Sequence, residues 1–166
     1  MRLTYFSDYS LRILLYLGVY DDRLVPAGEI AEAYGVSQNH LLKVAGTLSQ
    51  LGVVEAVRGR GGGFRLAVPP QEVNVGWLVR HTEPDFHLVE CFDRENDTCP
   101  ITPACMLKNV LHEAQTSFLE TLDRYTLADF LASPNRRRAF IKLWSQAAKS
   151  AEGVEGMGNG GPPSDD

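Results

Sequence analysis

The sequence predicts a mainly α-helical protein with a small β-wing, arranged as a winged helix-turn-helix followed by a long dimerisation helix. Two segments with a helical apolar period flank a tight turn at Gly35-Val36. The period then changes to two on either side of a glycine-rich turn, which is typical of a β-hairpin. A third apolar stripe, with spacings of four and three, begins near Cys105 and is typical of helices that pair.

Composition and charge limit the class of protein. The 166 residues suffice for one domain with an extension, and 44% apolar and 22% charged residues are typical of a globular chain. No apolar run approaches the roughly 18 residues of a membrane span, and the N-terminus lacks a signal-peptide layout, so we expect a cytoplasmic protein. The net charge is −5, yet residues 37–68 carry +3 and residues 151–166 carry −4. A basic patch on a mildly acidic body fits a DNA-reading element.

The helix-turn-helix starts with a helix predicted over residues 7–20, for which Ser7 or Asp8 is the expected N-cap. Residues 27–34 predict a short second helix. The third helix follows the tight turn and is expected to be capped by Ser37. Its apolar residues are expected to face inward: Leu41, Leu42, Ala45, Leu48 and Leu51.

The third helix begins with polar side chains that can form hydrogen bonds with bases. They are Ser37, Gln38, Asn39 and His40, with Lys43 one turn further along. A recognition helix enters the major groove with its N-terminal residues leading, and Gln and Asn can bind adenine at two points. Lys43 suits phosphate or guanine. We therefore expect contacts with double-stranded DNA; the alternative is a polar helix start that only caps itself.

Residues 53–57 and 63–68 predict the two strands of the wing, joined by a turn rich in glycine and arginine. Glycine lets the backbone approach closely, and Arg58, Arg60 and Arg65 can reach phosphates or a narrow minor groove. The alternative is a solvated hairpin without a partner. The order of the helices, the polar start of the recognition helix and the basic wing together favour DNA binding.

The second half of the chain predicts a short helix over residues 74–81, an ordered loop over 82–104 and one long helix over 105–132. The loop has no apolar period and contains three prolines. The apolar stripe of the long helix consists of Leu107, Leu111, Ala114, Phe118, Leu122 and Tyr125. Residues 135–149 are a basic amphipathic segment, and residues 151–166 are expected to be a disordered tail because they cannot bury apolar surface.

Three cysteines, Cys91, Cys99 and Cys105, lie within fifteen residues of one another. Three thiols cannot all pair, and a cytosolic setting disfavours structural disulfides. Zinc sites usually contain a close pair such as C-x₂-C, which is missing here, whereas the wide spacing suits an iron–sulfur cluster. Cys105 is expected to begin the long helix, where the helix dipole stabilises a thiolate and an anionic cluster.

Three thiolates leave one iron of such a cluster without a protein sulfur. Its ligand is expected to be an oxygen or nitrogen atom, or the position is open and reactive, which suits a sensor of a small molecule. The candidate ligands are Asp8, Glu90, Asp93, His87 and His112. Thr98 and Thr102 are expected to donate hydrogen bonds near the cluster. A zinc clip and three free thiols in a mobile loop remain the alternatives.

Several segments together resemble the NsrR family of nitric-oxide-sensing bacterial repressors. They are LTYFSDYSLRILLYL, YGVSQNHLLKV, VRGRGGGFRLA, CPITPACMLK and SFLETLDRYTLADF, and the resemblance covers residues 1–132. NsrR is part of a wider winged-helix family that includes the iron–sulfur regulator IscR. IscR has a histidine three residues after its third cysteine, where this chain has Lys108. That difference favours the NsrR branch.

The resemblance implies a homodimer with one [4Fe–4S] cluster per subunit, held by Cys91, Cys99 and Cys105. It also implies that Asp8 of the partner subunit supplies the fourth ligand, although Asp8 can equally be an N-cap and nothing more. The implied function is a repressor that binds a palindromic DNA operator. Nitric oxide would attack the cluster, release the operator and derepress genes for nitric-oxide detoxification.

These features divide the chain into four parts. Residues 1–81 are the expected winged helix-turn-helix DNA-binding domain, 82–104 the cluster-binding loop, 105–150 the dimerisation helix and C-terminal helix, and 151–166 the disordered tail. The alternative functions are a sensor of iron–sulfur status or redox state and a zinc-stabilised winged-helix DNA binder. A redox enzyme is disfavoured because the sequence has no dinucleotide-binding fingerprint or substrate-pocket constellation.

Overall fold

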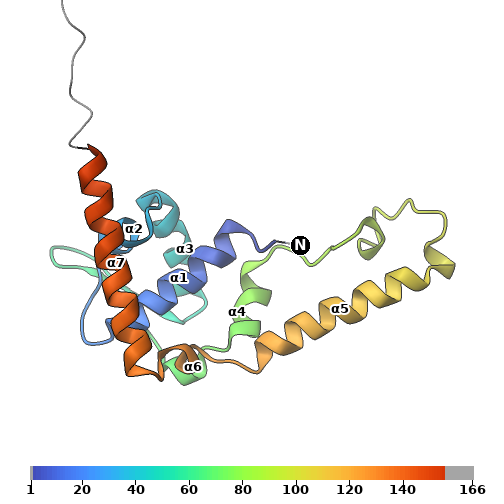
Figure 1. The fold of residues 1–166 in the computed structure, drawn as a ribbon. Coiled ribbons are helices and arrows are strands. Elements are labelled where there is room, and N and C mark those ends of the chain that lie inside the picture. The colour runs from blue at the N-terminus through green and yellow to red at the C-terminus, as the bar shows by residue number, and fades with distance from the viewer. Residues whose placement is uncertain (1, 156–166) are drawn as a thin grey trace, which may run out of the picture.

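The computed structural model describes residues 2–155 and consists of a winged-helix body with one long arm (Figure 1). The elements of the body are α1 (Tyr5–Val19), α2 (Ala27–Tyr34), α3 (Gln38–Gln50), β1 (Val54–Val57), β2 (Gly63–Leu66) and α4 (Val75–Thr82). The arm contains α5 (Met106–Asp123), after which α6 (Leu127–Leu131) and α7 (Pro134–Glu155) return to the body. The predicted fold class, mainly helical with a two-stranded wing, is confirmed.

The core of the body forms around α1, whose apolar face is buried against α3, α4 and α6. Ile13, Leu14 and Leu17 of α1 are almost fully buried, as are Leu41 and Leu48 of α3. Helix α2 ends at a glycine with a left-handed conformation, Gly35, so that α3 can turn back across α1. This packing fixes α3 relative to α1 and leaves its opposite side exposed.

The wing is an antiparallel pair in which Val54 lies opposite Leu66 and Val57 opposite Gly63. Phe64 is buried, and its backbone forms a bridge with Val25 that ties the wing to the segment between α1 and α2. In the turn, Gly59 has a φ of 101°, a conformation that side chains disfavour. The wing therefore has a fixed base and an exposed, glycine-rich tip.

The expected N-cap of the first helix is wrong. Thr4 is the N-cap of α1, and its side chain accepts a hydrogen bond from the backbone N–H of Ser7. Ser7 and Asp8 both lie in the first turn, where the Ser7 side chain is buried and Asp8 is half-exposed. Ser7 is unavailable as a cap because its hydroxyl is bonded to a distant residue, Thr82.

The inward face of α3 also differs in part from the prediction. Leu42 is 43% exposed, whereas Val44, which the pattern omitted, is buried with Leu41, Ala45 and Leu48. The packing of α1 and α2 selects this narrower face, because both helices contact the same side of α3. Ser37 occupies the N-cap position as expected, but its side chain forms no capping hydrogen bond.

The long helix ends earlier than predicted, at Asp123 instead of residue 132. A new helix, α6, starts at a capping box in which Thr126 and Asp129 bond to each other's backbone N–H groups. Asn74 holds the intervening turn, because its amide donates hydrogen bonds to the carbonyls of Asp123 and Tyr125. The T-x-x-D signature at residue 126 was the overlooked sequence signal.

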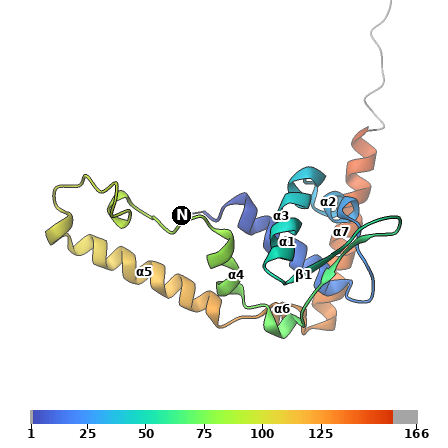
Figure 2. The ribbon, with the colours of Figure 1, turned by 180° about the vertical axis from the view of Figure 1, so that it is seen from behind.

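The loop over residues 82–104 is ordered as expected, with two short 3₁₀ helices at Glu90–Phe92 and Thr102–Ala104. The loop runs beside α5, to which it is joined by a hydrogen bond from the Gln115 side chain to the Phe86 carbonyl and by the rings of Phe92 and His112 (Figures 1 and 2). Loop and helix together form the arm.

Helix α7 covers the far side of α2 and continues to Glu155, five residues into the segment expected to be disordered. On the apolar side of this basic amphipathic helix, the Trp144 side chain is 9% exposed, and its ring centroid lies 4.5 Å from that of Tyr16. The rest of the expected disordered tail, residues 156–166, lies outside the described residues. Within residues 2–155 no helix is long and apolar enough to cross a membrane.

Candidate nucleic-acid interface and metal centre

The structure places the predicted base-reading residues at the exposed start of α3. Ser37, Gln38, Asn39, His40 and Lys43 are all exposed. The buried residues of α3, on its other side, hold the helix against α1 and α2, so the polar start faces solvent. An exposed, hydrogen-bonding N-terminal turn on a firmly packed second helix is the arrangement that reads base edges in the major groove.

The three wing arginines are not equivalent. Arg58 and Arg60 lie in the exposed tip, and neither forms a side-chain hydrogen bond or ion pair with another described residue. Arg65 lies on β2 and forms an ion pair of 2.8 Å with Glu55, directly opposite on β1. The hydrogen bond that the Arg65 guanidinium donates within this pair lowers the pKa of the Glu55 carboxyl. The positive charge available to DNA is therefore concentrated at Arg58 and Arg60.

The three cysteines lie on the arm. Cys91 is in the first 3₁₀ helix of the loop, Cys99 lies shortly before the second 3₁₀ helix, and Cys105 is the N-cap residue of α5. All three are half-buried free thiols. The position of Cys105 is the one expected, directly before the 18-residue helix α5.

Carboxylates of the arm organise the segments between the cysteines. Glu90 accepts hydrogen bonds from the backbone and the hydroxyl of Thr98, and these bonds lower the pKa of Glu90. Asp97 accepts from the Cys99 N–H and from the Thr102 hydroxyl, each at 3.1 Å. In this structure both hydroxyls donate to neighbouring carboxylates, and the expected donation of Thr98 and Thr102 near a cluster stays a prediction.

The structure brings the cysteines to one arm but not to one point. Among the described residues, no group of three or more His, Cys, Asp or Glu side chains is close enough together to hold a metal ion. The donor set nevertheless fits iron, because three thiols without disulfides flank a proline-containing turn at the positive end of a helix. A metal or cluster would have to draw the loop together.

Two of the other candidate ligands, Asp8 and Asp93, already have side-chain partners within the described structure. Asp8 forms a two-point ion pair with Arg12, at 2.7 and 3.1 Å. Asp93 accepts hydrogen bonds from the Glu95 N–H and the Asn96 amide, which lower the pKa of Asp93. Asp8 lies on α1, away from the tip of its own arm (Figures 1 and 2).

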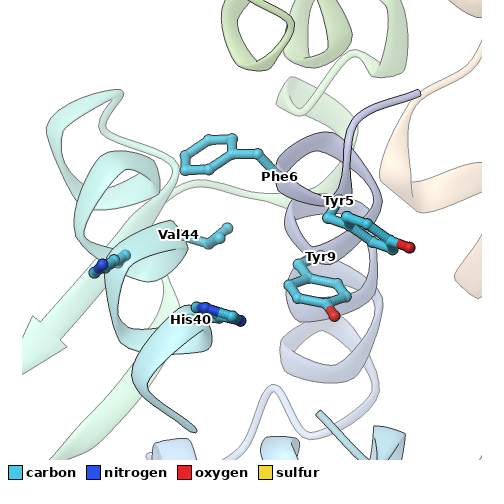
Figure 3. A pocket seen from close by; sticks show the side chains of 6 residues that line it. Tyr5, Phe6, Tyr9, His40 and Val44 are labelled. Atoms are coloured by element: carbon cyan, nitrogen blue, oxygen red, sulfur yellow. The ribbon is translucent and has the colours of Figure 1, made fainter. Parts of the chain in front are cut away.

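Two structural features close to Asp8 have no counterpart among the predicted ones. The first is a set of hydrogen bonds between α1 and the end of α4: Thr4 to Glu83 at 2.9 Å, and Ser7 to Thr82 at 2.8 Å. The second is a groove between α1 and α3, lined by Tyr5, Phe6, Tyr9, His40, Lys43 and Val44 (Figure 3). The sequence signal for the groove was the presence of three aromatic residues in the first turns of α1. The hydrogen bonds between α1 and α4 have no signal in the local sequence.

A winged helix-turn-helix with a polar recognition-helix start and a basic wing tip defines a DNA-binding transcriptional regulator. Comparison with known proteins identifies its family. The sequence model of the Rrf2 family, described as iron-dependent transcriptional regulator, matches residues 3–133. The chain therefore belongs to the Rrf2 family of transcriptional regulators, and it is a regulator, not an enzyme.

Relatives and solved structures agree with this assignment. The HTH-type transcriptional regulators NsrR of Halalkalibacterium halodurans and Bacillus subtilis are 47% and 46% identical to this chain, in both cases over 86% of this chain and 99% of the relative. IscR of T. potens superposes with a TM-score of 0.63 at 26% identity, over 80% of this chain and 87% of IscR. CymR, the global cysteine regulator of B. subtilis, has the same fold, with a TM-score of 0.62 at 23% identity over 78% of this chain and 95% of CymR.

Proposed function

We propose that this protein is a dimeric repressor that binds a palindromic operator and senses nitric oxide through a [4Fe–4S] cluster. The observation that carries the proposal is the position of Cys91, Cys99 and Cys105 on one arm between α4 and α5, with Cys105 as the N-cap residue of α5. The identity of 44–47% to regulators named NsrR supports it. The cluster fits the thiol donors and the family's description as iron-dependent.

The dimer is supported by the exposed apolar side of α5. None of the residues of α5, all of which the structure describes, is buried. Met106, Leu107 and Val110 are among the most exposed large apolar side chains of the described chain. An apolar helix face of this kind is stable in water when it pairs with a second copy. Two paired arms would set the separation of the two recognition helices, and a two-fold dimer reads a palindrome with half-sites about one helical turn apart.

Cys91, Cys99 and Cys105 would hold the cluster, and Asp8 of the partner subunit would complete the ligand set. When bound, the cluster supplies iron atoms that react with nitric oxide. The residues of the chain would keep the site ordered. The three thiolates would hold the loop against the start of α5, and the ion pair with Arg12 orients Asp8. Once ligation is lost, the loop relaxes and the recognition helices are no longer held at operator spacing. A change of about 2–4 kcal/mol would weaken operator binding roughly 30- to 1,000-fold.

The test is an absorption spectrum of protein purified without oxygen, with iron and sulfide counted on the same sample, followed by titration with nitric oxide. We expect about four irons per chain, bleaching by nitric oxide and a parallel loss of operator binding in gel-shift assays. Tight operator binding by cluster-free protein would contradict the mechanism. Zinc, or no metal after reconstitution, would contradict the cluster. Bleaching by oxygen with indifference to nitric oxide would favour the redox-sensing alternative.

The role of Asp8 has its own matched control. Asp8→Asn removes one proposed ligand, and Asp22→Asn neutralises an exposed carboxylate between α1 and α2. We expect the cluster of the Asp8→Asn protein to be lost faster under nitric oxide or chelator, while the Asp22→Asn protein behaves as the parent. Equal rates for both variants would leave the fourth position to solvent or another residue.

A further inference from the structure

Helix α3 exposes one aliphatic side chain among its polar residues. Leu42 is 43% exposed, whereas Leu41 next to it is 1% exposed. Of the leucine, isoleucine and valine side chains in residues 2–82, which the structure describes throughout, Leu42 alone is exposed. The other exposed aliphatic side chains of the described chain lie on the arm and on α7. An apolar side chain that the fold leaves in water is stabilised when a partner covers it.

Leu42 projects away from α1. His40 and Val44 point from α3 toward the first turns of α1 and line the groove between the two helices (Figure 3). Leu42 is two positions from each of them, and two positions correspond to about 200° around a helix with 3.6 residues per turn. Leu42 therefore lies on nearly the opposite side of α3 from this groove, where the helix faces solvent.

The neighbours of Leu42 on the helix surface are predicted DNA-reading residues. Gln38 and Asn39 precede Leu42 by four and three positions, the spacing at which helical side chains lie side by side, and both are exposed. Gly46 follows Leu42 by four positions, and a Cβ atom built there would have nothing within 4 Å. Two amides, one aliphatic side chain and a bare stretch of backbone thus follow one another along this face. The glycine lets a base edge approach closely beside Leu42.

The major groove of DNA offers one apolar group to such a side chain. The base edges there present hydrogen-bond donors and acceptors, and their apolar substituent is the C5 methyl group of thymine. Leucine forms no side-chain hydrogen bond, so the methyl group is the feature of a base pair from which Leu42 gains free energy. The amides of Gln38 and Asn39 suit adenine, whose partner in the duplex is thymine.

We propose that Leu42 is a specificity-determining residue that packs against the C5 methyl group of a thymine in the major groove. The inference rests on the DNA-binding part of the proposed function and is independent of the cluster and of nitric oxide. It adds a chemical feature of the operator: each half-site contains a thymine methyl group beside the bases that Gln38 and Asn39 contact.

The test compares thymine with deoxyuridine, which pairs with adenine in the same way and lacks only the C5 methyl group. Full-length protein purified without oxygen first selects its preferred duplex from a randomised pool. Each thymine of the selected half-site is then replaced in turn by deoxyuridine, and binding is measured by fluorescence anisotropy. For the parent protein, we expect a position at which this replacement weakens binding about fourfold, as for the loss of one buried methyl-sized group.

Two variants connect this position to Leu42. In Leu42→Ala and Leu42→Ser, we expect weaker binding to the thymine duplex and no further loss when deoxyuridine replaces that thymine. The effects of protein and DNA changes are then non-additive, as expected for groups in contact. Leu143→Ala is the matched control, because Leu143 is a 59% exposed leucine on α7 and should keep the parent's response at every thymine. Circular dichroism and melting temperature verify that each variant is folded.

The possible failures are distinguishable. A selected half-site without thymine, or one in which no deoxyuridine weakens binding, would overturn the inference while leaving DNA binding intact. A deoxyuridine effect that is undiminished in both Leu42 variants would assign the methyl group to another residue and also overturn the inference. A protein that selects no DNA sequence would overturn the proposed repressor as well. A Leu42-dependent methyl effect in protein that holds no cluster would support the inference and contradict the cluster.

Discussion

The hydroxyls of Ser7 on α1 and Thr82 on α4 share a buried hydrogen bond of 2.8 Å across 75 residues of sequence. Thr82 donates its own proton to the Leu78 carbonyl at 3.0 Å, so Ser7 is the donor of the shared bond. The pair joins the first turn of α1, which carries Asp8, to the point where the arm leaves the body. The Ser7 hydroxyl has this acceptor only while α1 and α4 stay in contact, whereas Thr82 keeps its bond to Leu78 within α4.

A double-mutant cycle tests this contact. Ser7→Ala and Thr82→Val should each lower the free energy of unfolding by about 1–2 kcal/mol, because each leaves a buried polar group without its partner. The double variant should be less destabilised than the sum, by about 1 kcal/mol. Urea unfolding of the four proteins gives the cycle, and strict additivity would show that the two hydroxyls act independently.

Gly76 on α4 is a point of close approach between the body and the arm. A Cβ atom there would collide with the backbone N and the carboxylate of Asp123 at the end of α5. We expect Gly76→Ala to lower the free energy of unfolding by about 1–3 kcal/mol through overpacking. Gly46→Ala on α3 is the control, because nothing lies within 4 Å of its Cβ; it should stabilise by about 0.5–1 kcal/mol. Equal changes in melting temperature for Gly76→Ala and Gly46→Ala would contradict the close contact between Gly76 and Asp123.

Trp144 anchors α7 to the body. Its ring lies 4.5 Å from that of Tyr16 and 5.7 Å from that of Tyr34. Trp144→Ala should lower the free energy of unfolding by about 3–5 kcal/mol, whereas Leu143→Ala at the neighbouring exposed position should change it by no more than about 0.5 kcal/mol. Chemical denaturation measures both. A small effect of Trp144→Ala would mean that α7 is dispensable for the body.

The wing arginines should contribute unequally to operator binding. Arg58→Ala and Arg60→Ala each remove a cation that has no ion-pair partner among the described residues, and each should flatten the plot of log affinity against log salt by about 0.9 per lost phosphate contact. Arg65→Ala should change the slope less, because Glu55 already balances Arg65. Fluorescence anisotropy over a salt series measures the three slopes, and a largest change at Arg65 would reverse this assignment.

The Glu29 carboxyl should make stability depend on acid pH. A hydrogen bond from Arg23 lowers the pKa of Glu29 below its usual 4.5, and Tyr16 adds a second bond of 2.9 Å. A lowered pKa stabilises the fold above the unfolded value, and this contribution is lost as the pH falls through the folded value. At pH 7, Glu29→Gln should lower the free energy of unfolding by about 0.2–1 kcal/mol, since the pair is partly exposed.

That deficit should shrink as the pH drops below 4.5, because the parent protein then loses the same charge. Glu32→Gln, on the same helix but exposed and without a side-chain hydrogen bond among the described residues, is the control and should show no such trend. Unfolding measured at pH 7 and in steps below pH 5 distinguishes the two. A deficit that is constant over this range would exclude Glu29 as the source.

Local sequence patterns were enough to predict the winged helix-turn-helix, the helix that follows the cysteines and the class of protein, but not the break between α5 and α6. The signals used were local: the spacing of apolar residues, the glycines at turns and the polar residues that begin the helix at Gln38. Neighbours along the chain decide whether a segment forms a helix or a strand. The wing and its arginines followed from the change of period. The cysteine positions relative to the long helix were also local, since Cys105 directly precedes the apolar stripe.

Tertiary structure alone decided which partner each side chain takes. Ser7 was a plausible cap until the fold placed it against Thr82, and Leu42 was a plausible core residue until α1 and α2 selected the other side of α3. The positive charge of Arg65 is balanced by an ion pair with Glu55 on the neighbouring strand. The groove at Tyr5 and the reach of the arm depend on contacts between residues far apart in sequence. Such contacts leave no local pattern, because the burial and hydrogen bonding they impose arise only when the helices pack.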